Sequence, residues 1–203
     1  MTPILAGVNL ELAPQQLGLV IGSSGSGKST LLELLSGLAK PTSGNIMWRD
    51  QNLDVESLQQ MAGLVFQFPE RHFCTNTILE ELRLGHPAIN SPEISQALTD
   101  VGLESLAWDK SPNDLSGGQQ RRLALAVQLI RQPQILLLDE PTAGLDWSMR
   151  LQVVNLLGDL KKKWTLLVVT HDASDLQGIA DCCWSIEHGK VTLVQAANAT
   201  NAE

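Results

Sequence analysis

Short apolar runs alternate with helical patterns along most of this chain. Four of the runs are short, rich in branched side chains and bounded by glycine or polar residues, which is typical of buried strands. They are Leu17–Ile21, Gly63–Phe66, Ile135–Leu138 and Leu166–Val169. Three longer stretches repeat apolar residues at helical spacing and predict helices. They are Ser29–Leu38, Gly117–Arg131 and Ser148–Leu160. Strands alternating with helices predict an α/β fold whose mostly parallel sheet is covered by helices on both faces.

The middle of the chain follows a different pattern. Residues 69–113 hold several helical patterns, no convincing strand and three prolines that break them. The prolines are Pro87, Pro92 and Pro112. We expect one domain over residues 1–203, with 69–113 as a helical subdomain inserted in the α/β core. The polar tail Ala196–Glu203 is expected to be frayed.

The last apolar stretch predicts a hairpin. Two short strand patterns within Cys182–Val194 flank a turn at His188 and Gly189. Cys182 and Cys183 suit strand packing, and with Cys74 they make an odd count without metal-ligand spacing. This cysteine usage favours a reducing compartment.

The net charge and the apolar pattern of the chain exclude some classes of function. The 203 residues carry a formal net charge of −8, which disfavours wrapping of nucleic acid because phosphate neutralisation needs clustered Lys and Arg. The short basic run Lys161–Lys163 fits the end of a helix. We see no signal peptide at the first residues and no apolar run long enough to span a bilayer. Any membrane association is therefore expected to come through a partner.

Nine consecutive residues fit the phosphate-binding pattern G-x-x-x-x-G-K-[ST]. They are Gly22, Ser23, Ser24, Gly25, Ser26, Gly27, Lys28, Ser29 and Thr30. Glycines let backbone amides converge on phosphate oxygens, and the following helix adds its N-terminal dipole. Lys28 can reach the β- and γ-phosphates, and the Ser29 hydroxyl can coordinate Mg²⁺. The alternative is a Gly/Ser turn with a chance lysine, but the strand before it and the helix after it favour a phosphate-binding loop.

The run Ile135–Leu138 ends in two carboxylates, Asp139 and Glu140. Ligands of open α/β sheets lie at the carboxyl ends of the strands, so Asp139 can hold Mg²⁺ through water. Glu140 should point elsewhere, where it can orient and polarise an attacking water. The alternative is an acidic pair that only starts a turn before Pro141, and the phosphate loop argues against it.

The segment Leu115–Gln119, which reads LSGGQ before a long helix, strongly resembles the signature of the ATP-binding-cassette (ABC) ATPases. Further family elements follow the family's order along the chain. They are Lys40–Gly44 after the first helix, Gln67 at the Q-loop position, Ala143–Asp146 at the D-loop position and His171 at the switch position. The resemblance implies a P-loop NTPase core of the RecA-like kind and a functional dimer.

The resemblance also implies roles for single residues. In the family two chains sandwich two ATP molecules, and the signature of one faces the γ-phosphate held by the other. The signature residues here are Ser116, Gly117, Gly118 and Gln119. The implied catalytic set is Glu140, His171, Gln67 and Lys28, the implied Mg²⁺ set is Ser29, Gln67 and Asp139, and Asp146 reaches across the dimer. By themselves, Ser116–Gly118 would be a helix cap and His171 a core histidine.

Two family features are missing. Residues 1 to 21 contain no aromatic side chain to stack on adenine, and the usual first strand is shortened or missing. We therefore expect weaker ATP affinity or poor base selectivity, since stacking contributes about 1–3 kcal/mol per base; an upstream start or a partner could also fill the gap. Trp147 stands where the family often has Pro, and it suits a subunit interface, a surface or a core position.

Several segments resemble those of the energy-coupling-factor group of ABC ATPases, which import vitamins and transition-metal ions. The similar parts are Val65–Glu70 with Phe73, Thr77–Leu82, Gly37–Leu38 and Arg121–Arg122. The resemblance implies a transmembrane coupling subunit, a second ABC ATPase as homodimer or heterodimer partner, and a peripheral place on the cytoplasmic side of a membrane or in an organelle stroma. The alternatives are the ATPase of another ABC transporter, such as an exporter, and a soluble ABC ATPase outside transport.

Overall fold

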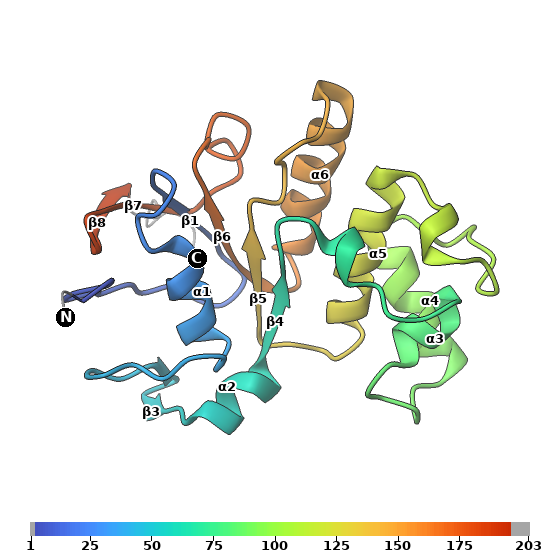
Figure 1. Cartoon of the computed structure of the whole chain (residues 1–203), viewed down its shortest axis with the longest axis horizontal. Helices are drawn as coiled ribbons and strands as arrows, with labels where there is room; N and C mark the ends of the chain where they lie inside the picture. Colours follow the sequence, from blue (N-terminus) through green and yellow to red (C-terminus); the bar gives the residue numbers. More distant parts are fainter. Residues whose placement is uncertain (1–2, 196–203) are drawn as a thin grey trace, which may run out of the picture.

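The computed structural model describes residues 3–195, which are built around a six-stranded sheet (Figure 1). The strands are β1 (Leu17–Ile21), β4 (Ala62–Val65), β5 (Ile135–Asp139), β6 (Thr165–Thr170), β7 (Cys182–Glu187) and β8 (Lys190–Gln195). Their order is β4-β5-β6-β1-β7-β8, and all neighbouring pairs are parallel except β7 with β8. The carboxyl ends of β1, β4, β5 and β6 therefore meet at one edge of the sheet.

Helices cover both faces of this sheet. They are α1 (Lys28–Leu35), α2 (Val55–Met61), α3 (Ile78–Arg83), α4 (Ser91–Asp100), α5 (Gly117–Leu129) and α6 (Trp147–Leu160), with 3₁₀ turns at Pro69–His72 and Pro112–Asp114. Successive residues of a strand point to opposite faces, so β5 serves two cores. Leu136 and Leu138 pack with residues of α5 and α6, and Leu137 packs with Leu31 and Leu32 of α1. The near-continuous apolar runs of the sequence follow from this burial on both sides.

The predicted elements are confirmed with small shifts at their ends. Helix α1 ends at Leu35 instead of Leu38 because Gly37 adopts a left-handed φ of +71° and the Leu38 amide donates to the Glu33 carbonyl oxygen, 2.8 Å away. Strand β4 ends one residue early, which leaves Phe66 outside the sheet. The hairpin of β7 and β8 turns at His188 and Gly189 as expected.

Residues 69–113 contain helices and turns, and no strand. Figure 1 shows α3 and α4 beyond α5, at the end of the molecule opposite to β8. Each of the two helices begins with a capping box, formed by Thr77 with Glu80 and by Asn90 with Glu93. These local signals fix both helix starts, although Pro87 and Pro92 interrupt the apolar pattern.

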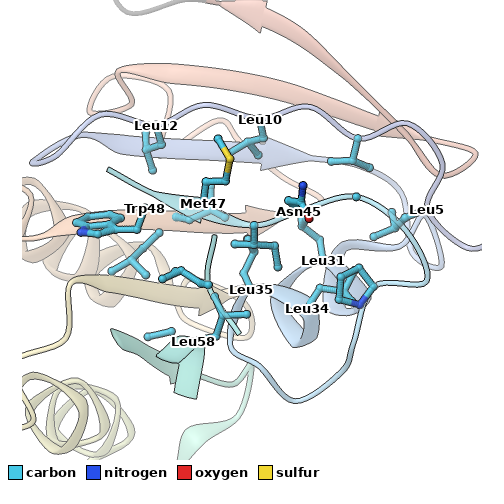
Figure 2. Close-up of a pocket in the computed structure, with 18 of the residues that line it drawn as sticks. Leu5, Leu10, Leu12, Leu31, Leu34, Leu35, Asn45, Met47, Trp48 and Leu58 are labelled. Carbon is cyan, nitrogen blue, oxygen red and sulfur yellow. The ribbon is translucent and has the colours of Figure 1, made fainter. Parts of the chain in front are cut away.

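The first described residues form no strand, in line with the expectation that the first strand is shortened or missing. Instead they run over an apolar cavity of about 520 Å³ (Figure 2). Leu10 and Leu12 line one side, Leu31 and Leu35 of α1 another, and Met47 comes from a small hairpin of β2 (Met47–Trp48) and β3 (Gln51–Asn52). None of residues 22–30 lines this cavity, so it is separate from the phosphate loop.

The structure also bears on the predictions for the cysteines, the basic run, Trp147 and membrane spans. Cys182 and Cys183 are buried in β7, and Lys161 forms the C-cap of α6. Trp147 is 72% exposed, which excludes a core position. Among residues 3–195, no helix combines the length and the apolar character that crossing a membrane requires. The tail Ala196–Glu203 lies outside the described residues.

Candidate nucleotide site

The phosphate loop connects β1 to α1, as its sequence context predicts. Gly25 and Gly27 have φ values of +77° and +108°, a region that L side chains rarely adopt. No side chain caps α1, so amides of its first turn are left for an anion. Lys28 is buried, and its Nζ donates to the carbonyl oxygens of Gly22 and Ser23 at 2.7 and 2.9 Å. The loop thus carries positive charge and directed amides, which suits phosphate.

Ser29 and Asp139 form an oxygen pair beside this loop. The Ser29 hydroxyl donates to Oδ2 of Asp139, 3.2 Å away. Burial raises the pKa of Asp139, the nearby charge of Glu140 raises it further, and the hydrogen bond from Ser29 lowers it. A hydroxyl and a carboxylate are ligands that Mg²⁺ accepts, and a bound cation would favour the charged carboxylate. These two residues therefore fit a magnesium ion.

Glu140 points away from Asp139, toward the end of β6. Its φ of +48° places a glutamate in the left-handed region, and its side chain is only 9% exposed. The Thr170 hydroxyl donates to Oε2 at 2.8 Å, and Nδ1 of His171 lies 2.9 Å from Oε1. Nζ of Lys28 lies 3.9 Å from the same Oε1. The two carboxylates thus serve different partners.

The sheet order explains why these groups meet. Strand β6 lies between β5 and β1, with Val169 paired to Asp139 and Thr170 paired to Ile21. The Gly22 amide donates to the Thr170 carbonyl oxygen at 3.1 Å, which ties the phosphate loop to β6. Sequence reasoning missed Thr170, although a polar residue that closes an apolar strand at the ligand-binding edge was a usable signal.

The remaining predicted site residues lie apart from this group. Ser116 and Gln119 form a capping box at the start of α5, and Asp146 caps α6 by accepting from the Met149 amide at 2.9 Å. Within residues 3–195, no hydrogen bond or ion pair joins Ser116 or the side chain of Gln67 to Lys28, Asp139 or Glu140. Within the described part of one chain, the start of α5 and the phosphate loop are therefore separate.

Replacing Asp139 by Asn is expected to change stability and magnesium binding in opposite directions. A carboxyl whose pKa is raised by folding holds its proton more tightly in the folded chain, so the ionised form costs stability as the pH rises through the folded pKa. Asp139→Asn should raise the melting temperature at pH 8 without ligand, with a smaller gain near pH 4. In the presence of ATP its Mg²⁺ affinity should fall about 10- to 100-fold, the range for residues that hold a metal through an outer shell.

Thermal unfolding at both pH values, with Mg²⁺ titrated at fixed ATP, measures both effects. Glu104→Gln, an exposed carboxylate outside the site, is the matched control and should change neither quantity. A lower melting temperature for Asp139→Asn at pH 8 would contradict the electrostatic argument, and an unchanged Mg²⁺ affinity would remove Asp139 from the magnesium site.

A phosphate loop after β1, a divergent acidic pair at the end of β5 and a histidine after β6 define the class of this protein. It is a P-loop ATPase, and the LSGGQ segment at the start of α5 is the feature that it shares with the ATP-binding cassettes. The model of the family described as "ABC transporter" matches residues 5–143, and the chain belongs to this family. The protein is an ATP-binding, ATP-hydrolysing subunit of an ABC transporter.

Similar proteins support the assignment over nearly the whole chain. The ABC transporter I family member 11, chloroplastic, of Arabidopsis thaliana is 45% identical over 95% of this chain and 75% of its own length. The energy-coupling factor transporter ATP-binding protein EcfA2 of Streptococcus agalactiae is 39% identical over 92% of this chain and 71% of its own length. The structure of cbiO1 of Clostridium perfringens, part of the ABC transporter complex cbiONQ, superposes with a TM-score of 0.86 at 30% identity and covers 94% of this chain and 80% of its own.

Proposed function

We propose that this subunit powers import through a transmembrane coupling partner, as an ATPase of the energy-coupling-factor type. The observation that carries the proposal is the similarity to EcfA2, at 39% identity over 92% of the chain, together with the likeness to cbiO1. Through this transmembrane partner, the chain would attach peripherally to the cytoplasmic face of a membrane or to the stromal face in an organelle.

The segment after β4 offers a surface for such a partner. Phe66 is 43% exposed and stacks on His72, with ring centroids 5.0 Å apart. Next to it the guanidinium of Arg71 lies 4.6 Å from the centre of the Phe68 ring. Exposed aromatic side chains and an arginine are typical of interface cores. This cluster flanks Gln67 on both sides, so a membrane partner docked here would act directly on the Q-loop position.

In our proposal, each polar group of the site has its own task with ATP. Lys28 and the amides at the start of α1 hold the β- and γ-phosphates. Ser29 and Asp139, the latter through water, would hold a magnesium ion together with Gln67, and a bound ion would neutralise charge on the phosphate oxygens. Glu140, oriented by Thr170, accepts a proton from the attacking water, and His171 contacts the γ-phosphate. The left-handed backbone at Glu140 is strain of the kind that functional positions retain.

A second cassette completes the site in this proposal. The N-terminus of α5 is formed by Ser116, Gly117, Gly118 and Gln119, which make no hydrogen bond to the phosphate loop within the described part of one chain. A partner chain, identical or homologous, would place its signature against the γ-phosphate held here, and Asp146 would face that partner. Two ATP molecules would then lie between two cassettes.

The proposal is tested by capture of the assembly from native membranes. Tagged Glu140→Gln protein is incubated with Mg·ATP, recovered and analysed by mass spectrometry, with Lys28→Ala protein as a matched control that should not form the ATP-bound assembly. We expect a small polytopic membrane protein together with a second cassette. Recovery of a permease of another kind would replace the importer assignment by a different ABC transporter. Recovery of soluble partners alone would contradict the transport role.

A further inference from the structure

A buried arginine links the signature helix to the turn that carries Glu140. Arg121 lies one helical turn after Ser116 on α5 and is only 5% exposed. Its Nη1 donates to the carbonyl oxygens of Pro141 and Ala143 at 2.6 and 3.1 Å. Its Nη2 donates to the carbonyl oxygen of Gln67 at 3.1 Å. One side chain therefore holds three segments: the start of α5, the turn after Glu140 and the Q-loop position.

The chemistry of this contact is unusual for a buried cation. Within residues 3–195, no carboxylate lies at ion-pair distance from the guanidinium, so backbone oxygens alone replace its water shell. Burial lowers the pKa of Arg121, and the negative charge of Glu70 partly opposes this effect. A planar group with donors on two nitrogens can bridge two loops at once, which the single nitrogen of a lysine cannot do in the same geometry.

The three hydrogen bonds of Arg121 reach residues of the nucleotide site through the backbone. Pro141 follows Glu140 directly, and the Ala143 amide donates to the Glu140 carbonyl oxygen at 3.0 Å. The guanidinium of Arg121 therefore binds a turn that also has its own backbone hydrogen bond. A shift of α5 along its axis would move Arg121 with it, because both the cap and the arginine belong to the same helix. That shift would act on the Glu140 backbone, whose left-handed conformation leaves little freedom.

We propose that Arg121 is a positioning residue that makes hydrolysis at Glu140 depend on nucleotide bound by the signature segment Ser116–Gln119 of the same chain. The inference rests on the proposed two-cassette site, in which these two parts of one chain serve two different ATP molecules. Arg121 then transmits occupancy of one ATP site to the other, and the two sites hydrolyse ATP cooperatively.

The test compares steady-state hydrolysis by the assembled ATPase carrying wild-type chain, Arg121→Met or Arg121→Lys. For Arg121→Met we expect kcat to fall on the order of tenfold, since small displacements of a reacting group are costly. The KM for ATP and the Kd of the phosphate loop for ATP should stay within about twofold, and the Hill coefficient should fall toward 1. A structural role alone would lower the melting temperature and the active fraction but keep the Hill coefficient. Arg121→Lys keeps the charge, covers the case that the Met variant fails to fold, and should also lose cooperativity.

The neighbouring Arg122→Met is the matched control. Arg122 donates to the Gly102 carbonyl oxygen at 3.1 Å and makes no described contact with the Glu140 turn, so its variant should keep kcat and the Hill coefficient. Folded Arg121 variants with wild-type cooperativity would overturn the inference, and so would an equal loss in Arg122→Met. A wild-type assembly that hydrolyses ATP without cooperativity would also overturn the inference, whereas wild-type chain that hydrolyses ATP as a monomer would contradict the two-cassette site on which the inference rests.

Discussion

Glu140→Gln protein is expected to bind Mg·ATP with wild-type affinity and to hydrolyse it 10²- to 10⁴-fold more slowly, the range for loss of a general base. The amide keeps the size of the side chain and can still accept from Thr170, whose hydroxyl lies 2.8 Å from Oε2. It cannot take a proton from water. ATP should therefore accumulate uncleaved between two cassettes, and the ATP-bound dimer should become the main species in size-exclusion chromatography.

Three measurements distinguish the loss of the general base from a general loss of folding or of ATP binding. Turnover, ATP affinity and dimer fraction are determined for Glu140→Gln, for wild type and for the control Glu104→Gln, whose exposed carboxylate lies outside the site. Glu104→Gln should match wild type in all three. Wild-type turnover in Glu140→Gln would show that another group accepts the proton, and a loss of ATP affinity would mean that Glu140 supports binding instead of chemistry.

Much of this site could be predicted from the sequence because its parts are local. The nine residues of the phosphate loop carry their own turn chemistry, and the apolar run before Asp139 and Glu140 marks a strand that ends in two carboxylates. The general rule that parallel strands gather their carboxyl ends at one edge then brings Lys28, Asp139 and His171 together. In the structure the Ser29 hydroxyl donates to Asp139 and Nδ1 of His171 lies 2.9 Å from Oε1 of Glu140, so these side chains lie at the same edge of the sheet.

The features that sequence reasoning missed depend on register and long-range packing. Thr170 contacts Glu140 only because β6 lies between β5 and β1, and no local pattern sets that order. The three carbonyl partners of Arg121 come from turns 20 to 54 residues away along the chain. The left-handed φ of Glu140 could not be predicted from the sequence either, since this conformation favours glycine and asparagine. The two-residue strands β2 and β3 are too short to give an alternating pattern.

We expect the first glycine of the phosphate loop, Gly22, to tolerate substitution poorly. Gly22 has an ordinary φ, so conformational freedom is not the reason for glycine there. A Cβ at this position would lie 2.6 Å from both the Ile186 carbonyl oxygen and Oγ of Ser26, and it would also meet Cγ2 of Ile186. The carbonyl belongs to β7 and cannot rotate away. Gly22→Ala should therefore lower the free energy of unfolding by about 1–3 kcal/mol, the usual cost of overpacking.

The same strain should weaken ATP binding, because the cheapest relief is a displacement of the loop that holds the phosphates. If the loop must return to its original place to bind, 1–3 kcal/mol of strain corresponds to a roughly 5- to 150-fold higher Kd. Denaturant unfolding and ATP titration measure the two effects in one variant. Gly178→Ala is the matched control, since Gly178 also has an ordinary φ but a Cβ there meets no atom within 4 Å. A Gly22→Ala protein as stable and as tight for ATP as Gly178→Ala would mean that β7 yields to the added methyl group, and that the contact between Ile186 and Gly22 does not hold the phosphate loop in place.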